Sequence, residues 1–125
     1  MIESATILGA GSWGTALAAL MAERGMRVQF WGRDAELMNE MNVTRRNDRY
    51  LDSVTLPETV TITSELSALE PSDLLIFVVP SRGIHDIARQ AAAAGLGKHG
   101  PRVLSCTKGI ELNSGLRMSE ILAEI

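Results

Sequence analysis

The stretch Ala5-Thr6-Ile7-Leu8-Gly9-Ala10-Gly11-Ser12-Trp13-Gly14 decides the fold of this chain. It begins with a short, mainly apolar run that ends at glycines, as a buried parallel strand does. Gly9, Gly11 and Gly14 then fit the pattern G-x-G-x-x-G. From Gly14 onward, apolar residues recur at helical spacing. The pattern therefore predicts a strand, a tight glycine turn and a helix in direct succession.

Each glycine of this turn has its own expected role. Gly9 permits the sharp turn, Gly11 lets the backbone approach a pyrophosphate, and Gly14 lets the helix pack closely on the strand. The amino end of the helix adds free N–H donors and a positive dipole for an anion. A glycine turn without a ligand is the alternative, but the strand–turn–helix context favours binding of a dinucleotide.

Outward from this turn, strands and helices alternate along the whole chain. Strands are expected at 5–8, 28–31, 60–62, 74–79 and 103–106. Helical segments are expected at 14–24, 34–42, 64–69, 83–94 and 116–125, and a long loop at 43–57. This order predicts an α/β fold, a Rossmann-like doubly wound parallel sheet that is truncated at residue 125 before the end of the domain.

Charge and hydropathy exclude several other classes of protein. A formal net charge of −3 argues against a surface for nucleic acid or anionic membranes. The most apolar run, residues 74–79, is far shorter than a membrane span. The first residues lack the basic flank and long apolar segment of a signal peptide, so a cytoplasmic location is expected. No metal site is expected.

The end of the second expected strand bears on the choice between NAD and NADP. An acidic residue there would accept from the ribose 2′-hydroxyl and repel a 2′-phosphate. The sequence has Arg33 instead, whose planar guanidinium suits a phosphate or stacks on adenine. Asp34 comes one position late and also fits the role of a helix N-cap. The pattern favours NADP over NAD, with a solvated Arg33 as the alternative.

A second polar segment, Ser105-Cys106-Thr107-Lys108-Gly109, follows the fifth expected strand. Lys108 should therefore emerge at the carboxyl edge of the sheet, where ligands of open α/β sheets bind. A cation there can neutralise a substrate phosphate or polarise a carbonyl group. A plain surface charge is the alternative, and these residues alone leave the two interpretations open.

Together these pieces resemble the NAD(P)-dependent glycerol-3-phosphate dehydrogenase family of the bacterial type. The resemblance covers essentially the whole chain in the family's order and spacing. Its matching stretches are 9–18, 30–33, 47–51, 56–57, 77–81 and 107–111. Two positions depart from the family pattern: Asp52 stands where many relatives have proline, and Gly83 stands where relatives often carry a bulkier residue.

The resemblance implies roles for individual residues. Ser12 and Trp13 would lie against the dinucleotide, and Arg33 would meet its adenosine end. Lys108 would contact both the cofactor and the glycerol phosphate, and Tyr50 would lie near the cofactor. No catalytic residue is assigned within the chain, because the family's general acid–base lysine belongs to a later domain.

The resemblance also implies a domain arrangement and a reaction. Residues 1–125 would form the NAD(P)-binding domain, and a helical C-terminal substrate domain with the acid–base lysine would follow Ile125. The enzyme would interconvert dihydroxyacetone phosphate and sn-glycerol 3-phosphate and so feed phospholipid synthesis; a homodimer of the full-length protein is compatible with this. Two alternatives are another NADP-linked reductase, such as a ketopantoate reductase, and a non-catalytic dinucleotide-binding module. The Thr-Lys-Gly-Ile-Glu segment at 107–111 counts against the ketopantoate reductase.

Overall fold

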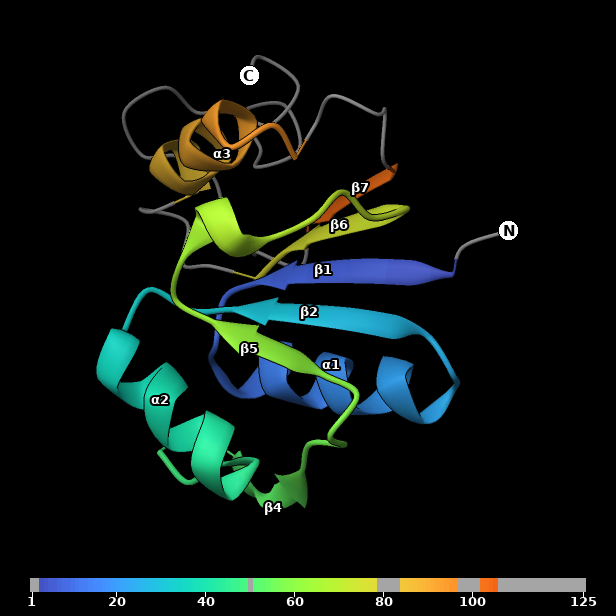
Figure 1. Cartoon of the computed structure of the whole chain (residues 1–125), viewed down its shortest axis with the longest axis vertical. Helices are drawn as coiled ribbons and strands as arrows, with labels where there is room; N and C mark the ends of the chain where they lie inside the picture. The colour runs from blue at the N-terminus through green and yellow to red at the C-terminus, as the bar shows by residue number, and fades with distance from the viewer. Residues whose placement is uncertain (1–2, 50, 79–83, 97–101, 106–125) are drawn as a thin grey trace.

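The computed structural model of the chain describes residues 3–49, 51–78, 84–96 and 102–105. Its centre is a five-stranded sheet in the order β5-β2-β1-β6-β7, with every neighbouring pair parallel (Figure 1). The strands are β1 (Ser4–Leu8), β2 (Arg27–Trp31), β5 (Thr61–Thr63), β6 (Leu74–Phe77) and β7 (Arg102–Ser105). The predicted doubly wound parallel sheet is confirmed.

The order in which successive strands are added to the sheet reverses next to β1. It runs outward from β1 through β2 to β5, and then crosses back to β6 and β7 on the other side. β1 therefore pairs with β2 on one side and with β6 on the other. In open α/β sheets, ligands bind outside the carboxyl ends of the strands at such a reversal point. The fold thus singles out the carboxyl end of β1.

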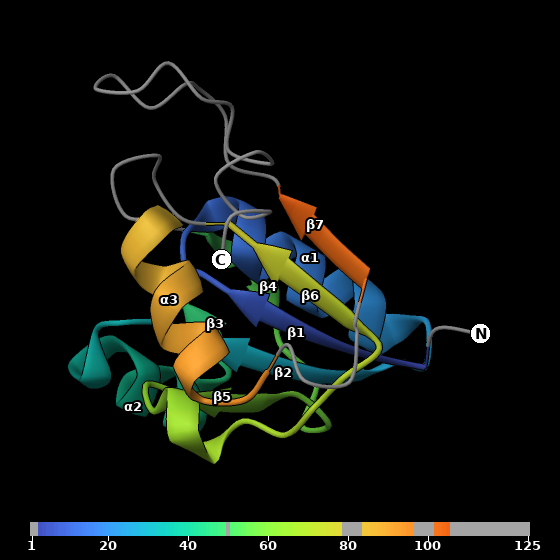
Figure 2. The same cartoon turned by 90° about the horizontal axis from the view of Figure 1, so that it is seen from above.

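Helices cover both faces of the sheet. They are α1 (Ser12–Glu23), α2 (Ala35–Thr44), α3 (Ile84–Ala93) and the short 3-10 helix η1 (Leu66–Ala68). Figure 2 shows α1 and α3 on opposite sides of the sheet. Successive strand residues alternate between two hydrophobic cores: Ile7 packs in the core beneath α1 and α2, whereas Leu8 packs in the core beneath α3. This alternation explains why the strands read as continuous apolar runs.

The segment 43–57 is not the long loop that the sequence predicted. α2 continues to Thr44, and an antiparallel hairpin of β3 (Arg46–Asn47) and β4 (Leu51–Thr55) follows. β3 has only two residues and a bulge, so it carries no alternating pattern that sequence reasoning could detect.

Arg45 ends α2 and fixes the base of this hairpin. Its φ of 59° lies in the left-handed region, and its N–H still donates to the carbonyl oxygen of Met41 (2.8 Å). Its guanidinium Nη2 donates to the carbonyl oxygens of Pro57 (2.7 Å) and Val60 (2.5 Å). These bonds join the end of α2 to the chain entering β5. They therefore fix both ends of the β3–β4 hairpin, residues 46–55, which we call the insert.

The other predicted elements are confirmed to within a few residues, apart from the helix predicted at 116–125, which lies outside the described residues. α1 begins at Ser12 rather than at Gly14. The sequence placed this start late because Ser12 and Trp13 are exposed and do not contribute to the apolar pattern. Within the described part of the chain, no helix combines the length and apolar character needed to cross a membrane.

Candidate functional site

The turn after β1 depends on the backbone conformation of Gly9. Its φ of 131° belongs to a region that residues with side chains rarely adopt. Its N–H donates to the carbonyl oxygen of Trp31 at the end of β2 (2.8 Å). On the other side of β1, the N–H of Val78 donates to the carbonyl oxygen of Leu8 (2.8 Å). The turn therefore begins where the pairing of the central strands ends, at the carboxyl edge of the sheet.

Gly14, in the first turn of α1, lies directly against the backbone of this turn. A Cβ atom at this position would lie 1.9 Å from the carbonyl oxygen of Gly9 and 3.2 Å from the ring of Phe30. A contact of 1.9 Å with a backbone atom does not occur in a folded protein unless the backbone shifts. The helix can pack this closely on β1 only because residue 14 has no side chain.

We expect Gly14→Ala to lower the free energy of unfolding by about 3 kcal/mol, because the turn must move to relieve the contact. Urea denaturation of the full-length protein measures this loss. The matched control is Gly11→Ala, since a Cβ at Gly11 meets no atom within 4 Å. It should change the free energy of unfolding by less than about 1 kcal/mol. Similar losses in the two variants would contradict the close packing at Gly14.

Gly11 is a glycine that no packing contact explains. Its φ of −82° is open to any residue, and the space around its Cβ position is empty. It is the N-cap of α1, so no side chain caps the first N–H groups of the helix, and no acidic residue stands in the first turn. The amino end of α1 therefore offers uncapped N–H donors beside open space. This geometry fits the pyrophosphate of a dinucleotide, which would fill that space and accept from those donors.

Ser12 and Trp13 follow Gly11 on the first turn of α1, and both are exposed. Trp13 has an exposed fraction of 67%, which is large for an aromatic side chain. An indole beside the uncapped helix end can cover part of a planar ligand, and burial of its ring would then favour the complex.

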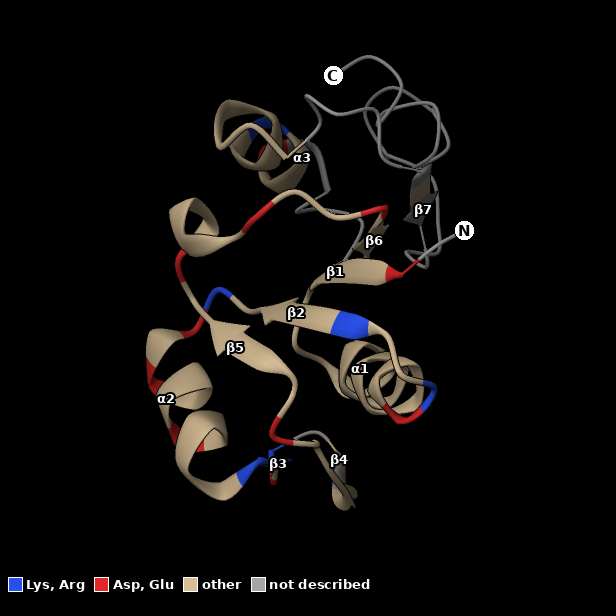
Figure 3. Cartoon of the chain, turned by 45° about the vertical axis from the view of Figure 1, so that its right-hand side comes forward, with Lys and Arg blue, Asp and Glu red and all other residues tan. Residues whose placement is uncertain are grey.

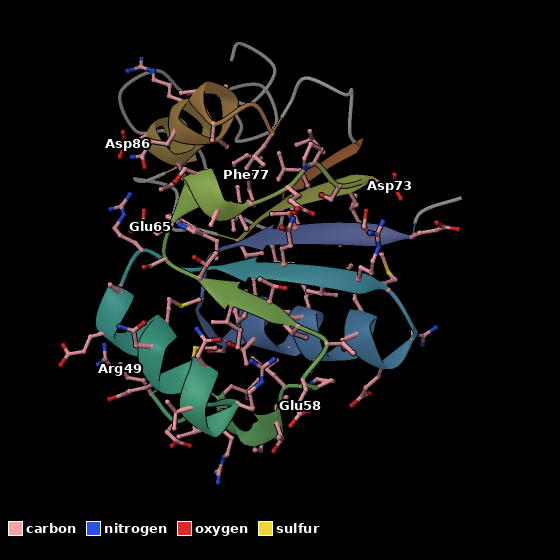
Figure 4. All side chains as sticks on the ribbon, in the orientation of Figure 1. Arg49, Glu58, Glu65, Asp73, Phe77 and Asp86 are labelled. Carbon is pink, nitrogen blue, oxygen red and sulfur yellow. The ribbon has the colours of Figure 1, made fainter. Side chains whose placement is uncertain are left out.

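Arg33 lies two residues beyond β2, on the connection to α2 that carries a basic segment in Figure 3. Its Nη2 is 3.5 Å from a carboxylate oxygen of Asp86 on α3, and each side chain is 66% exposed. In Figure 4, Asp86 lies on the side of the molecule where β1 and β2 have their carboxyl ends. An ion pair this exposed stabilises the fold little, so Arg33 is free to exchange Asp86 for a phosphate.

Asp34 is engaged by the helix that it begins. Its carboxylate accepts from the N–H of Leu37 (3.2 Å) and from Nη1 of Arg49 (2.8 Å). The Leu37 N–H, and after it Arg49, hold the pKa of Asp34 below its usual value. The structure confirms the interpretation of Asp34 as a helix N-cap and leaves Arg33 as the residue at the strand end.

Two of the predicted site residues, Tyr50 and Lys108, lie outside the described residues. The glycine turn and Arg33 lie at one edge of the sheet, at the ends of the adjacent strands β1 and β2. Among the described residues, no group of three or more His, Cys, Asp and Glu side chains is placed to hold a metal ion. Sequence reasoning missed three polar residues at this edge: Thr15, Asn47 and Asp86. Two signals were available: the threonine directly after the last glycine of the fingerprint, and the family-like stretch 47–51, which begins at Asn47.

The strand order, the reversal point at β1 and the glycine turn that opens α1 define a Rossmann-type dinucleotide-binding domain. Residues 4–125 match the family described as NAD-dependent glycerol-3-phosphate dehydrogenase N-terminus. The chain belongs to this family.

Relatives and solved structures agree with this membership. The chain is 39% identical over 119 residues to the glycerol-3-phosphate dehydrogenase [NAD(P)+] of Chlorobium limicola, covering 94% of this chain and 35% of the relative. It is 38% identical over 125 residues to that of Enterococcus faecalis, covering 99% of this chain and 36% of the relative. The crystal structure of glycerol-3-phosphate dehydrogenase from Coxiella burnetii superposes with a TM-score of 0.87 at 35% identity, over 98% of this chain and 37% of that one. The chain thus spans about a third of the length of these relatives.

Proposed function

We propose that this chain is the cofactor-binding part of an enzyme that interconverts dihydroxyacetone phosphate and sn-glycerol 3-phosphate with NAD(P). The family match over residues 4–125 carries the proposal. The uncapped amino end of α1, with open space at Gly11, supports it. A protein from Enterococcus faecalis described as a putative 2-dehydropantoate 2-reductase superposes with a TM-score of 0.68 at 13% identity, a likeness that shows a common fold alone. A non-catalytic module is not favoured, because the similar relatives are named as dehydrogenases.

The chain's own residues bind and orient the reactants. A nicotinamide cofactor supplies the hydride chemistry when it is bound. The N–H groups of Gly11 and Ser12 hold the pyrophosphate, Trp13 covers the dinucleotide beside them, and Arg33 meets the adenosine end. Lys108, in the segment after β7, contacts the cofactor and the phosphorylated substrate and stabilises charge that develops on the substrate oxygen. Fixing both reactants at one sheet edge lowers the entropic cost of their reaction.

The remaining parts of the proposal concern the full-length protein. A helical C-terminal domain supplies further substrate contacts and the general acid–base lysine, and Tyr50 lies near the cofactor. Arg33 at the end of β2 favours NADP over NAD as the cofactor. A cytoplasmic location and a homodimer stay predictions from the sequence.

A steady-state assay of the full-length protein tests the proposed reaction. Oxidation of NADPH or NADH should require dihydroxyacetone phosphate, and 2-dehydropantoate should not replace it. The control omits the triose phosphate. Turnover with 2-dehydropantoate alone, or tight NADPH binding without turnover on either substrate, would contradict the proposal and favour one of the two alternatives.

We expect Arg33→Ala to weaken NADPH binding more than NADH binding. Loss of a charge-assisted contact to the 2′-phosphate costs roughly 1.5–3 kcal/mol, which is about one to two decades in Kd. Calorimetric titration of both cofactors measures the difference. The matched control is Asp86→Asn, which breaks the same ion pair from its other side and should leave NADPH binding as tight or tighter. Equal losses of affinity for NADPH and NADH in Arg33→Ala would show that Arg33 does not contact the 2′-phosphate.

A further inference from the structure

A buried amide from the β3–β4 hairpin holds the glycine turn from its inner side. Asn47 is completely buried, and its Nδ2 donates to the carbonyl oxygen of Ala10 (2.8 Å) and to Oγ1 of Thr15 (2.9 Å). The hydroxyl of Thr15, also completely buried, donates onward to the carbonyl oxygen of Gly11 (2.8 Å). A carbonyl oxygen can only accept, so the nitrogen of the Asn47 amide must face Ala10. The order of donors and acceptors in this chain of bonds is therefore fixed.

These bonds set the direction of two peptide planes. In a trans peptide, the carbonyl of one residue and the N–H of the next point in opposite directions. The Ala10 carbonyl is held inward by Asn47, so the N–H of Gly11 points outward. The Gly11 carbonyl accepts from both the N–H (3.0 Å) and the hydroxyl (2.8 Å) of Thr15, so the N–H of Ser12 points away from Thr15 and out of the helix end. Successive N–H groups at the start of a helix can donate together to one anion.

Asn47 is not placed there for the stability of the fold alone. Its Oδ1 atom is buried and has no hydrogen-bond partner among the described residues. A buried acceptor without a partner costs stability. The amide nitrogen, in contrast, has two short bonds, one to Ala10 in the glycine turn and one to Thr15 in the first turns of α1. A buried side chain that lowers the stability of the fold through an unpaired acceptor is typical of a functional site.

We propose that Asn47 is a positioning residue for the dinucleotide: through Ala10 and Thr15 it aims the N–H groups of Gly11 and Ser12 at the pyrophosphate. This inference rests on the proposed function, because it assumes that the turn binds a dinucleotide. The insert, which the sequence predicted to be a loop, then contributes to binding of the cofactor. Its hairpin carries the amide that preorganises a binding site 32 to 37 residues earlier in the chain.

The test compares ligands with and without a pyrophosphate in the full-length protein. Asn47→Leu keeps the size of the side chain and removes its donor. It should raise the Kd of NADPH at least tenfold and leave the Kd of adenosine 2′-monophosphate, which lacks the pyrophosphate, within about twofold. In steady state, the KM for NADPH should rise at least tenfold while kcat stays within about threefold, since the lost contact acts on binding. Equal weakening of both ligands would overturn the inference, because it would indicate a general loss of structure.

A matched control comes from α2, the helix that precedes the insert. Asn42 also donates through Nδ2 to two backbone carbonyl oxygens, those of Met38 (3.2 Å) and Ile62 (2.9 Å), without touching the glycine turn. Asn42→Ala should leave the Kd of NADPH within about twofold. A tenfold loss in this control would overturn the inference, because loss of a side-chain amide away from the glycine turn would then impair binding as well.

A second pair of variants decides the matter if Asn47→Leu does not fold. Thr15→Val removes the hydroxyl between Asn47 and Gly11, whereas Thr15→Ser keeps it. The valine variant should raise the Kd of NADPH about threefold to tenfold relative to the serine variant. Equal affinities in the two variants overturn the inference. Failure of the wild-type protein to bind NADPH or NADH overturns the proposed function as well, whereas tight binding that withstands every variant overturns this inference alone.

Discussion

Gly11→Val should abolish dinucleotide binding, with the Kd of NADPH and NADH raised at least about a hundredfold, while the protein stays folded. The valine side chain would occupy the open space where the pyrophosphate lies. The fold tolerates it, because the φ of −82° and ψ of −166° at Gly11 suit a β-branched residue. Calorimetric titration of the full-length variant measures the affinity, and thermal unfolding verifies the fold.

A matched control adds the same side chain to the other end of α1. Glu23→Val changes an exposed residue at the end of the helix and should leave the affinity for both cofactors unchanged. Wild-type affinity in a folded Gly11→Val variant would show that the cofactor binds elsewhere. The assignment of the glycine turn would then be wrong.

Lys108→Ala should lower kcat/KM for dihydroxyacetone phosphate at least about a hundredfold, the scale seen when one donor to the transition state is removed. Dinucleotide binding should fall much less, because the pyrophosphate and adenosine contacts come from the ends of β1 and β2. The matched control is Lys98→Ala, which removes the other lysine of the chain and should leave kcat/KM unchanged. Steady-state kinetics of the three full-length proteins measures both effects.

The same assay tests the proposed division of labour between domains. The 125-residue chain by itself should show no turnover even with Lys108 intact, since the proposed acid–base lysine belongs to the C-terminal domain. Turnover by this chain would refute that division. An unimpaired Lys108→Ala variant would return Lys108 to the status of a surface charge.

The sequence predicted the sheet well because its signals are local. Runs such as 74–77 are buried on both faces, and the glycine turn at 9–14 combines a strand end, a positive φ and a helix start within a few residues. The position of Asp34 as an N-cap was equally readable, because its hydrogen bond spans three residues. Each of these features follows from neighbours in the chain.

The hairpin and its amide could not be predicted in the same way. β3 is two residues long, and the insert is anchored by bonds from Arg45 to carbonyl oxygens 12 and 15 residues later. Asn47 reaches back to the glycine turn across 37 residues, and Asp86 lies more than 50 residues from Arg33. No local pattern indicates which polar side chains meet across such separations. The sequence pointed to the residues that form the turn and missed those that hold it.

A crystal structure of the full-length protein with bound NADPH shows directly whether the glycine turn holds the pyrophosphate. The pyrophosphate oxygens should lie at hydrogen-bond distance, about 3 Å, from the N–H groups of Gly11 and Ser12, with the 2′-phosphate beside Arg33. The carbonyl oxygen of Ala10 should remain bonded to Asn47. A dinucleotide bound away from the glycine turn, for example in the pocket beside Arg27 at the opposite edge of the sheet, would contradict this binding mode.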